Sequence, residues 1–467
     1  MARVATSRRV LPVAAVVAAT LAGCALQDPP SRDELNRDAF VEMVPPGQWA
    51  EPGAAAGPVE AGWLAAFADE RLDALVAEAL ARNPDLRVAG AQVEQAAAYV
   101  RIAGGSIYPA VNLLGKTSGG DGSGAEPLNA GIVSASWELD VWGRVRYGAR
   151  AAEDQFAAAE ADYAYARQSL AALVVRGWVL ATEAELQRQL AAESLAAAEK
   201  LLSLARDRQR VGIGSELEVR VAAGNAETFR DIVRQLEFGT QQALRGLELV
   251  VGRYPSADLE AATALPQLTA DAPAGVPSEL LERRPDVIAA ERRVAAAFSR
   301  TRQAEAARLP QFTLSATGSY LDSDVLVLQD IDNPIFGLGL GLVMPLYAGG
   351  ALKAQVELRT AEQKEAVARY ASVGLKAFGE VEGALSAERT ARERQAILAA
   401  QLGEGERALE LENVRYRVGS TDLRNVAQQQ LAVYGARSSL LRLQAERVAQ
   451  RVALYLALGG GFEKSQG

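Results

Sequence analysis

Two spacings of hydrophobic residues alternate along the chain. Apolar side chains occupy every second position in three short segments, residues 133–141, 312–320 and 336–344, and a fourth segment, residues 110–118, alternates less cleanly. That period is typical of β-strands with two different faces. Each pair of segments is followed by a long stretch rich in Ala, Glu, Arg and Gln, where apolar residues such as Tyr370, Gly374 and Phe378 recur after three or four positions. The pattern predicts two strands and then long helices, twice.

The predicted helices are long. All 18 prolines lie outside residues 128–254 and 346–467, so neither stretch contains the residue that most often breaks a helix. A helix over residues 144–210 would be about 100 Å long at 1.5 Å per residue. A short glycine-containing turn ends each long helix, and a second helix is expected over 216–250 and 421–458. The chain should therefore contain two antiparallel helical hairpins.

The two halves of the body share short motifs in the same order. Residues 83–86 match 284–287, and 108–111 match 309–312, at a separation of 201 positions. Residues 142–144 match 348–350 at 206 positions, and 210–212 match 417–419 at 207. Ordered matches with so little drift indicate a tandem duplication. We assign the first repeat to residues 63–255, a linker to 256–277, the second repeat to 278–460 and a tail to 461–467.

The amino terminus has the features of a secretory signal. Three arginines precede an apolar run that ends in Leu21-Ala22-Gly23-Cys24, so residues 1–23 are assigned to a signal peptide. The tetrad resembles a bacterial lipoprotein box, in which the cysteine becomes the lipidated first residue, and Cys24 is the only cysteine. A plain signal peptide with a chance cysteine is the alternative. Residues 24–62, rich in Pro, Gly and Ala, are expected to form an extended strap.

The alternating segments have a further consequence. Segments of about ten residues with one apolar and one small or polar face are typical of transmembrane β-barrel strands, although strands of soluble sheets alternate in the same way. The polar segments 119–129 and 321–333 are expected to be exposed hairpin loops. In lipid every backbone amide must be paired, and the smallest single-chain barrels have eight strands. If four strands span a membrane, several chains must share one barrel.

The composition excludes several kinds of catalytic, metal and disulfide site. The 467 residues include no histidine and one cysteine, and the formal net charge is −9. Catalytic triads, His-ligated zinc and a disulfide framework are therefore excluded, and an acidic chain without a basic tract favours no nucleic acid. The run Gly337–Gly341 invites comparison with a phosphate-binding loop, but Pro345 follows and no helix begins directly after it. We expect no enzyme activity, no metal site and no cofactor beyond a covalent lipid on Cys24.

The combination of a lipoprotein box, a tandem repeat, two strands then two long helices in each half, and a Val-Gly turn at each helical tip resembles one family. It is the outer-membrane factor family, the TolC-like channels of tripartite efflux pumps and type I secretion. The chain is most similar to the lipoprotein branch that serves RND-type pumps. The resemblance implies a homotrimer, with a shared twelve-stranded transmembrane β-barrel continuous with a twelve-helix periplasmic α-barrel. Helices over 67–82 and 278–308 would belong to its equatorial region.

The resemblance also implies a function. The trimer would be a passive exit duct for small molecules, supplied by an inner-membrane RND-type pump through a periplasmic adaptor. The adaptor would dock at the two turns, formed by Val211, Gly212 and Ile213 and by Val418, Gly419 and Ser420. The barrel lumen would be lined by Ser134, Ser136, Thr313, Ser315, Thr317, Gly339 and Gly341. Type I secretion is the alternative use of such a channel.

In this family the far end of the tunnel is a closed iris at the turns. Six residues are expected at this periplasmic aperture: Tyr416, Arg417, Asp422, Asn425, Gln428 and Glu218. Relatives often carry aspartates at the positions of Asn425 and Gln428, which are not acidic here, so Asp422 or Glu218 would have to supply negative charge. Solvated tip residues without a gating role are the alternative.

Two other classes of lipoprotein fit less well. A periplasmic adaptor has one helical hairpin set between soluble β-domains, whereas this sequence repeats its hairpin at matching places. A structural coiled-coil lipoprotein would not need the Gly/Leu strand at 336–344.

Overall fold

The computed structural model describes residues 26–41, 46–52, 57, 59, 61–117, 128–268, 272–323 and 334–463. The predicted signal peptide, Cys24 and most of the two hairpin loops lie outside the described residues. The chain divides into two compact units, each made of three segments. Unit 1 contains residues 1–43, 91–161 and 289–373, and unit 2 contains residues 44–90, 162–288 and 374–467.

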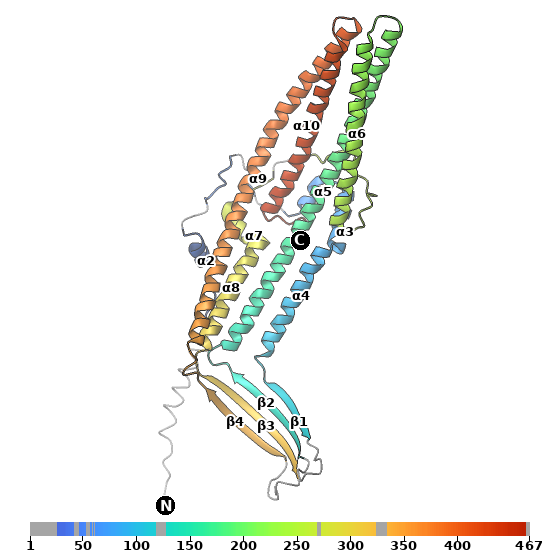
Figure 1. Ribbon diagram of the computed structural model, residues 1–467. Helices are drawn as coiled ribbons and strands as arrows, with labels where there is room; N and C mark the ends of the chain where they lie inside the picture. Colours follow the sequence, from blue (N-terminus) through green and yellow to red (C-terminus); the bar gives the residue numbers. More distant parts are fainter. Residues whose placement is uncertain are drawn as a thin grey trace, which may run out of the picture. The chain divides into compact units, whose positions relative to one another are not determined.

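The four predicted strands form one antiparallel sheet in unit 1 (Figure 1). They lie in chain order as β1 (Ala110–Thr117), β2 (Leu128–Leu139), β3 (Gln311–Ser323) and β4 (Ile335–Val343). Within the described residues, the outer edges of β1 and β4 pair with no further strand. The sheet is therefore open on both sides.

The long helices have the predicted lengths. α5 (Arg144–Arg210) and α9 (Ala351–Arg417) contain 67 residues each. α6 (Glu216–Val251) follows α5, and α10 (Leu423–Ala457) follows α9, which confirms two helical hairpins. Both long helices contribute residues to unit 1 and to unit 2.

The hairpin turns form where the sequence predicts them, for local reasons. Gly212 and Gly419 have φ angles of 81° and 77°, which favour glycine because other residues carry a Cβ that crowds the backbone. Ser215 and Glu218 form a capping box at the start of α6, and the Asp422 carboxylate accepts a hydrogen bond from the second residue of α10. These caps satisfy N–H groups that have no partner inside the helix.

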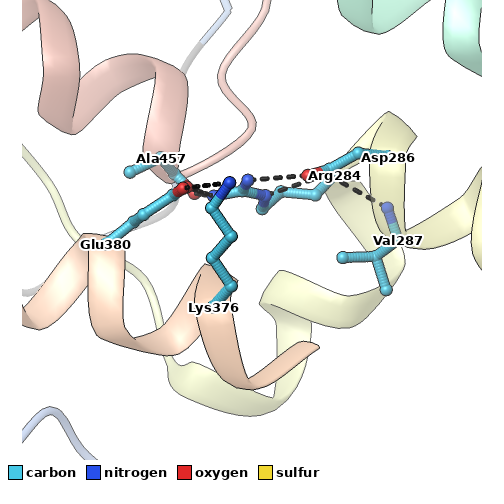
Figure 2. Close-up of polar contacts among 6 residues, drawn as sticks. All are labelled: Arg284, Asp286, Val287, Lys376, Glu380 and Ala457. Atoms are coloured by element: carbon cyan, nitrogen blue, oxygen red, sulfur yellow. Dashed lines mark hydrogen bonds and ion pairs between the residues drawn. The ribbon is translucent and has the colours of Figure 1, made fainter. Parts of the chain in front are cut away.

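Each repeat has a corner where a short helix meets a helix of 22 residues. In the first repeat α3 (Glu70–Arg82) meets α4 (Pro84–Gly105), and in the second α7 (Pro277–Arg283) meets α8 (Pro285–Ala306). The prediction of one helix over 278–308 is therefore wrong. Arg284 is extended, with φ −73° and ψ 121°, because a proline disfavours the helical conformation of the residue before it. The contacts of Arg284 are drawn in Figure 2.

The amino-terminal strap is partly helical, which corrects the extended chain predicted for residues 24–62. A capping box of Ser31 and Glu34 begins α2 (Arg32–Ala39). The hydroxyl of Tyr370 on α9 donates a hydrogen bond of 2.6 Å to Asn36 Oδ1 in unit 1. Local capping and a contact with a residue far along the chain therefore outweigh the Pro- and Gly-rich composition.

The largest apolar core lies in unit 2. It gathers residues of α3, α5, α6 and α10 and of η1 (Trp63–Phe67). Many of its members are alanine or valine, so the helices approach closely. Trp178 Nε1 donates to Asp69 Oδ2 at 2.9 Å, which gives one of the two tryptophans in this core a polar partner.

Candidate channel surfaces

One face of the sheet exposes large apolar side chains. Leu338 is 84% exposed and Phe336 is 81% exposed. The strand register and the alternation of side chains place further exposed residues on the same face, namely Val111, Leu113, Val133, Trp137, Leu340 and Leu342. A continuous exposed apolar surface marks contact with a membrane or another protein.

Most residues of the opposite face are small or carry hydroxyl groups, and the larger Leu114 and Val343 also lie on it. Ser134 lies opposite Thr317, Ser136 lies opposite Ser315, and Thr313 lies opposite Gly341. Gly339 pairs with Ser315 on the other side. The seven residues predicted to line the lumen therefore share one face of one sheet. Their contact with a water-filled pore stays a prediction.

Glycines on β4 let the hydroxyl groups of β3 lie close to that strand. A Cβ at position 337 would come within 2.8 Å of Thr317 Oγ1, and one at position 339 within 3.0 Å of Ser315 Oγ. Ser315 Oγ instead donates to the Gly339 carbonyl at 3.3 Å. The alternating glycines thus keep this face small and polar.

Polar contacts at the end of β2, which the sequence analysis did not identify, fix the start of α5. Asp140 accepts hydrogen bonds of 2.9 Å from two backbone N–H groups in the first turn of α5. Arg146 also pairs with Asp140 at 3.1 Å, and Arg144 Nε donates to Glu138 Oε1 at 2.9 Å. Acidic groups stabilise the positive end of a helix. The sequence did contain a signal for these contacts, because two acids are followed by Gly143 and then by two arginines.

Exposed aromatic residues flank the strands at the ends that join the helices. Tyr108 precedes β1, Trp142 follows β2 and Tyr347 follows β4, and all three are exposed. Trp142 Nε1 donates to the Pro310 carbonyl at 2.7 Å. Rings of aromatic residues at both ends of the strands are a feature of outer-membrane barrels, where they lie at the lipid headgroups.

The two helical turns expose apolar side chains at their tips. Val418 is 74% exposed, and Val211 and Ile213 are exposed to a similar extent. Ser420 is also exposed, and its hydroxyl donates to the Arg415 carbonyl at 3.1 Å. The predicted docking residues therefore form accessible apolar tips on structured turns.

Tyr416, predicted at the aperture, is buried near the turns. Its side chain is 1% exposed and packs with Leu201, Ala222 and Leu423. The guanidinium of Arg208 on α5 lies 4.9 Å from the centre of the Tyr416 ring. Burial, and then the negative charge of Glu218, raise the pKa of Tyr416 above its ordinary value. Tyr416 therefore joins the two hairpins of one chain by packing.

Sequence analysis missed Arg208 as the partner of Tyr416. Neither Arg208 Nε nor the Tyr416 hydroxyl has a hydrogen-bond partner among the residues that the structure describes. A signal was available, because both residues lie in the last helical turn before a tip glycine, where helices of one bundle end together.

The other predicted aperture residues are accessible to different degrees. Arg417, Gln428 and Asn425 are exposed, and Asn425 Nδ2 donates to Thr421 Oγ1 at 3.0 Å. Glu218 and Asp422 use their carboxylates to cap α6 and α10, as described above. Any role of their charge at an aperture would therefore be combined with a structural one.

A cavity that the sequence did not indicate lies between the two hairpins in unit 2. Its volume is about 460 Å³, and its lining includes Phe229, Tyr434, Glu410 and Arg437. Phe229 and Tyr434 pack edge to face with ring centres 5.4 Å apart. These residues come from three helices, so sequence periodicity alone could not bring them together.

No helix among the described residues is both long and apolar enough to cross a bilayer.

Comparison with known proteins supports one class. The sequence matches the outer membrane efflux protein family over residues 75–253 and 276–460. It is 31% identical over 444 residues to the pyoverdine export outer membrane protein OpmQ of Pseudomonas aeruginosa, covering 91% of this chain and 93% of the relative. It is 26% identical over 412 residues to the cation efflux system protein CusC of Escherichia coli O6:H1, covering 86% and 89%.

Solved structures agree with the sequence relatives. The open state of the outer membrane channel MtrE of Neisseria gonorrhoeae aligns with a TM-score of 0.82 and 25% identity, over 95% of this chain and 99% of that one. The outer-membrane channel OprN aligns with a TM-score of 0.79 and 27% identity, over 90% and 99%.

An open sheet with an apolar and a small polar face, joined to two pairs of long helices, defines an outer-membrane channel fold. The chain belongs to the outer membrane efflux protein family. The predicted family, fold class, efflux function and outer-membrane location are confirmed.

Proposed function

We propose that the chain is one subunit of a homotrimeric channel in a tripartite efflux pump, and that the trimer is a passive exit duct for small molecules. The observation that carries this proposal is the open sheet with one exposed apolar face. In lipid the amides of both outer edges need partners, which four strands cannot provide by closing on themselves. Three copies of the four-stranded sheet would give twelve strands, above the minimum of eight.

A periplasmic adaptor would bind the helical tips, and an inner-membrane RND-type pump would supply the energy. The exposed Val211, Ile213 and Val418 offer apolar contacts on turns that are held by glycines and helix caps. Small apolar anchors surrounded by polar residues are common in protein interfaces. The channel itself would carry out no covalent chemistry.

The aperture would be closed by contacts between neighbouring hairpins. Arg417, Asn425 and Gln428 are exposed and can reach such neighbours, with Glu218 and Asp422 as the nearby acids. Tyr416 would contribute indirectly, because its buried ring and Arg208 hold the two hairpins of one chain together.

A lipid on Cys24 would anchor the chain beside its own strands. Leu26, two residues later, lies against Gly143 at the start of α5. Gln27 N donates to the Tyr147 hydroxyl at 2.8 Å, and Arg150 pairs with Asp28 at 3.1 Å. These contacts hold the start of the strap against the first turns of α5, which follows the exposed Trp142 in sequence, and this supports an anchor at the membrane surface.

Cargo selection would rest with the pump. Relatives of similar length are named for the export of pyoverdine, of cations and of toluene. Because related channels are named for molecules that differ so much in charge and size, the duct is a conduit rather than a specific receptor.

Conductance across a planar lipid bilayer tests the proposal. Purified protein with an aperture loosened by Arg417→Ala should form long-lived ion-conducting pores. Ser315→Trp adds bulk on the polar face and should lower the conductance, whereas Leu338→Trp is the matched change on the apolar face and should not. A protein that inserts but never conducts, or a conductance lowered equally by both variants, would contradict the duct.

A further inference from the structure

The two repeats are related by two fixed offsets. α5 and α9 have equal lengths and starts that differ by 207 positions, and α4 and α8 have equal lengths and starts that differ by 201. The same offsets relate the strand hairpins. Ala110 of β1 faces Ser136 of β2, and adding 201 and 207 gives Gln311 and Val343, which face each other in β3 and β4. The internal symmetry therefore holds at the level of single residue pairs.

The junction between β2 and β3 is where the first repeat meets the second. Ser136 faces Ser315 there, and Ser134 faces Thr317. The reverse junction, from β4 to β1, does not occur within the described part of one chain. A ring of several copies would create that junction between one chain and the next.

We infer that β4 of one copy pairs antiparallel with β1 of a second copy in the register that the internal junction dictates. Val343 lies 207 positions after Ser136 and is its equivalent in the second repeat. Leu114 lies 201 positions before Ser315 and is its equivalent in the first repeat. Val343 therefore faces Leu114 of the second copy. The same operation on Ser134 and Thr317 places Gly341 opposite Lys116 of the second copy. This inference rests on the proposed function and specifies the interface that it requires.

The faces of the strands are consistent with this register. Val343 lies on the same face as Gly341 and Gly339, because side chains alternate along a strand. Leu114 lies on the face of Asn112, which is opposite Ser134. The inferred register thus joins the faces of the two copies that carry the predicted lumen residues. A shift of one residue would turn the small polar face of one copy toward the lipid side of the next.

A contact between helices, converted by the same offsets, leads to the same pairing of two copies. Gly148 of α5 lies directly against Gln303 of α8, since a Cβ at position 148 would be 2.7 Å from Gln303 Nε2. The offsets convert this pair into Gln355 of α9 and Ile102 of α4 in the second copy. Both are exposed in one chain, Ile102 to 68%.

The burial of α4 and α8 differs as this inference requires. Val294 and Ala296 of α8 are buried, whereas Tyr99 of α4 is 66% exposed. α8 is also tied to α9 by the Thr301 hydroxyl, which donates to the Arg359 carbonyl at 3.1 Å. α8 thus has a helix of each repeat beside it, and α4 lacks the neighbour that α9 of another copy would supply.

Disulfide trapping in native membranes tests the register. V343C/L114C should oxidise to covalent dimers and trimers on non-reducing gels, because facing residues of adjacent strands lie within disulfide range. S136C/S315C is the matched control, since it is the same position at the internal junction and should oxidise without a change in mass. Each single-cysteine variant should remain monomeric on the gel.

Shifted pairs make the test specific. V343C/K116C is displaced by two residues on the same face, and we expect about tenfold less of the covalent oligomers than for V343C/L114C. I102C/Q355C tests the helical side and should also give oligomers. Efficient trapping of V343C/K116C in place of V343C/L114C would overturn the register while leaving the trimer intact. If the unsubstituted protein did not have the mass of a trimer under native conditions, the proposed function would be overturned instead.

Discussion

The two corners of the repeat perform one task with different chemistry. In the first repeat Asn83 Nδ2 donates to the Val250 carbonyl at the end of α6 at 2.8 Å, and its Oδ1 accepts from Leu86 N at 3.0 Å. In the second repeat Arg284 stands at the matching position and donates to the Ala457 carbonyl at the end of α10 at 3.1 Å. Each side chain binds the last turn of the returning helix to the corner.

The charge of Arg284 brings in partners that Asn83 does not need. Figure 2 shows its guanidinium between Asp286 and Glu380, at 2.8 and 2.7 Å. The side chain is 2% exposed, and burial alone would lower its pKa, but the hydrogen bonds that its guanidinium donates to these two acids raise the pKa above its ordinary value. A neutral amide satisfies the corner by itself, whereas a buried cation requires a network. The second corner should therefore be the more sensitive to single changes.

Removing the cation should have the largest effect. Arg284→Ala leaves Asp286 and Glu380 without their buried partner, and we expect a loss of about 3 kcal/mol in the free energy of unfolding. The apparent midpoint of thermal unfolding in detergent, followed by circular dichroism, measures it. Lys376→Ala is the control, because its ammonium is exposed and 3.8 Å from Glu380, and it should cost less than about 0.5 kcal/mol. Equal effects would show that surface charge, not burial, dominates this corner.

Asn83→Ala should have an intermediate effect. The substitution removes two hydrogen bonds but leaves no buried charge without a partner. We therefore expect a loss of about 1–2 kcal/mol in the free energy of unfolding, from the same measurement. A loss as large as that of Arg284→Ala would contradict the distinction between the corners.

The glycines behind the two corners should respond alike. Gly252 and Gly459 have φ angles of 89° and 70°, and a Cβ at either would lie about 3 Å from the backbone of its corner. We expect Gly252→Ala and Gly459→Ala each to cost about 1–2 kcal/mol. Because backbone strain does not depend on the charge of the corner, a clear difference between these variants would show that the corners also differ in shape.

An exposed ion pair at the first corner should give the smallest effect, and one that depends on pH. Hydrogen bonds from Arg253 hold the pKa of Glu78 below its ordinary value of 4.5, although burial acts in the opposite direction. The pair therefore stabilises fully above pH 4.5 and loses its contribution as the pH falls through the lowered value. Unfolding midpoints from pH 7 to pH 3 should show that Glu78→Gln removes less than about 1 kcal/mol near neutrality and nothing in acid. A difference that persists at low pH would point to packing.

Much of the candidate site could be predicted from periodicity. The alternation at Ser134 and Thr317 assigns both to small polar faces, and the register then brings them opposite one another. The glycines at 212 and 419 mark the turns correctly because a left-handed backbone is a local requirement. Tyr416 shows where such reasoning ends. The family resemblance places it at an aperture because it precedes a tip glycine, but its burial depends on Arg208 and Leu201 of another helix.

The sequence by itself determined the strands, the long helices, their turns and the duplication, because each follows from the spacing and type of neighbouring residues. Only the tertiary structure decided that Arg284 is buried with two acids, that the strap folds into α2, and which pairs face each other in the sheet. Those features join residues far apart along the chain, and their energies depend on distances that no local pattern contains. The duplication links both levels, since it lets contacts observed inside one chain specify the contacts that we infer between chains.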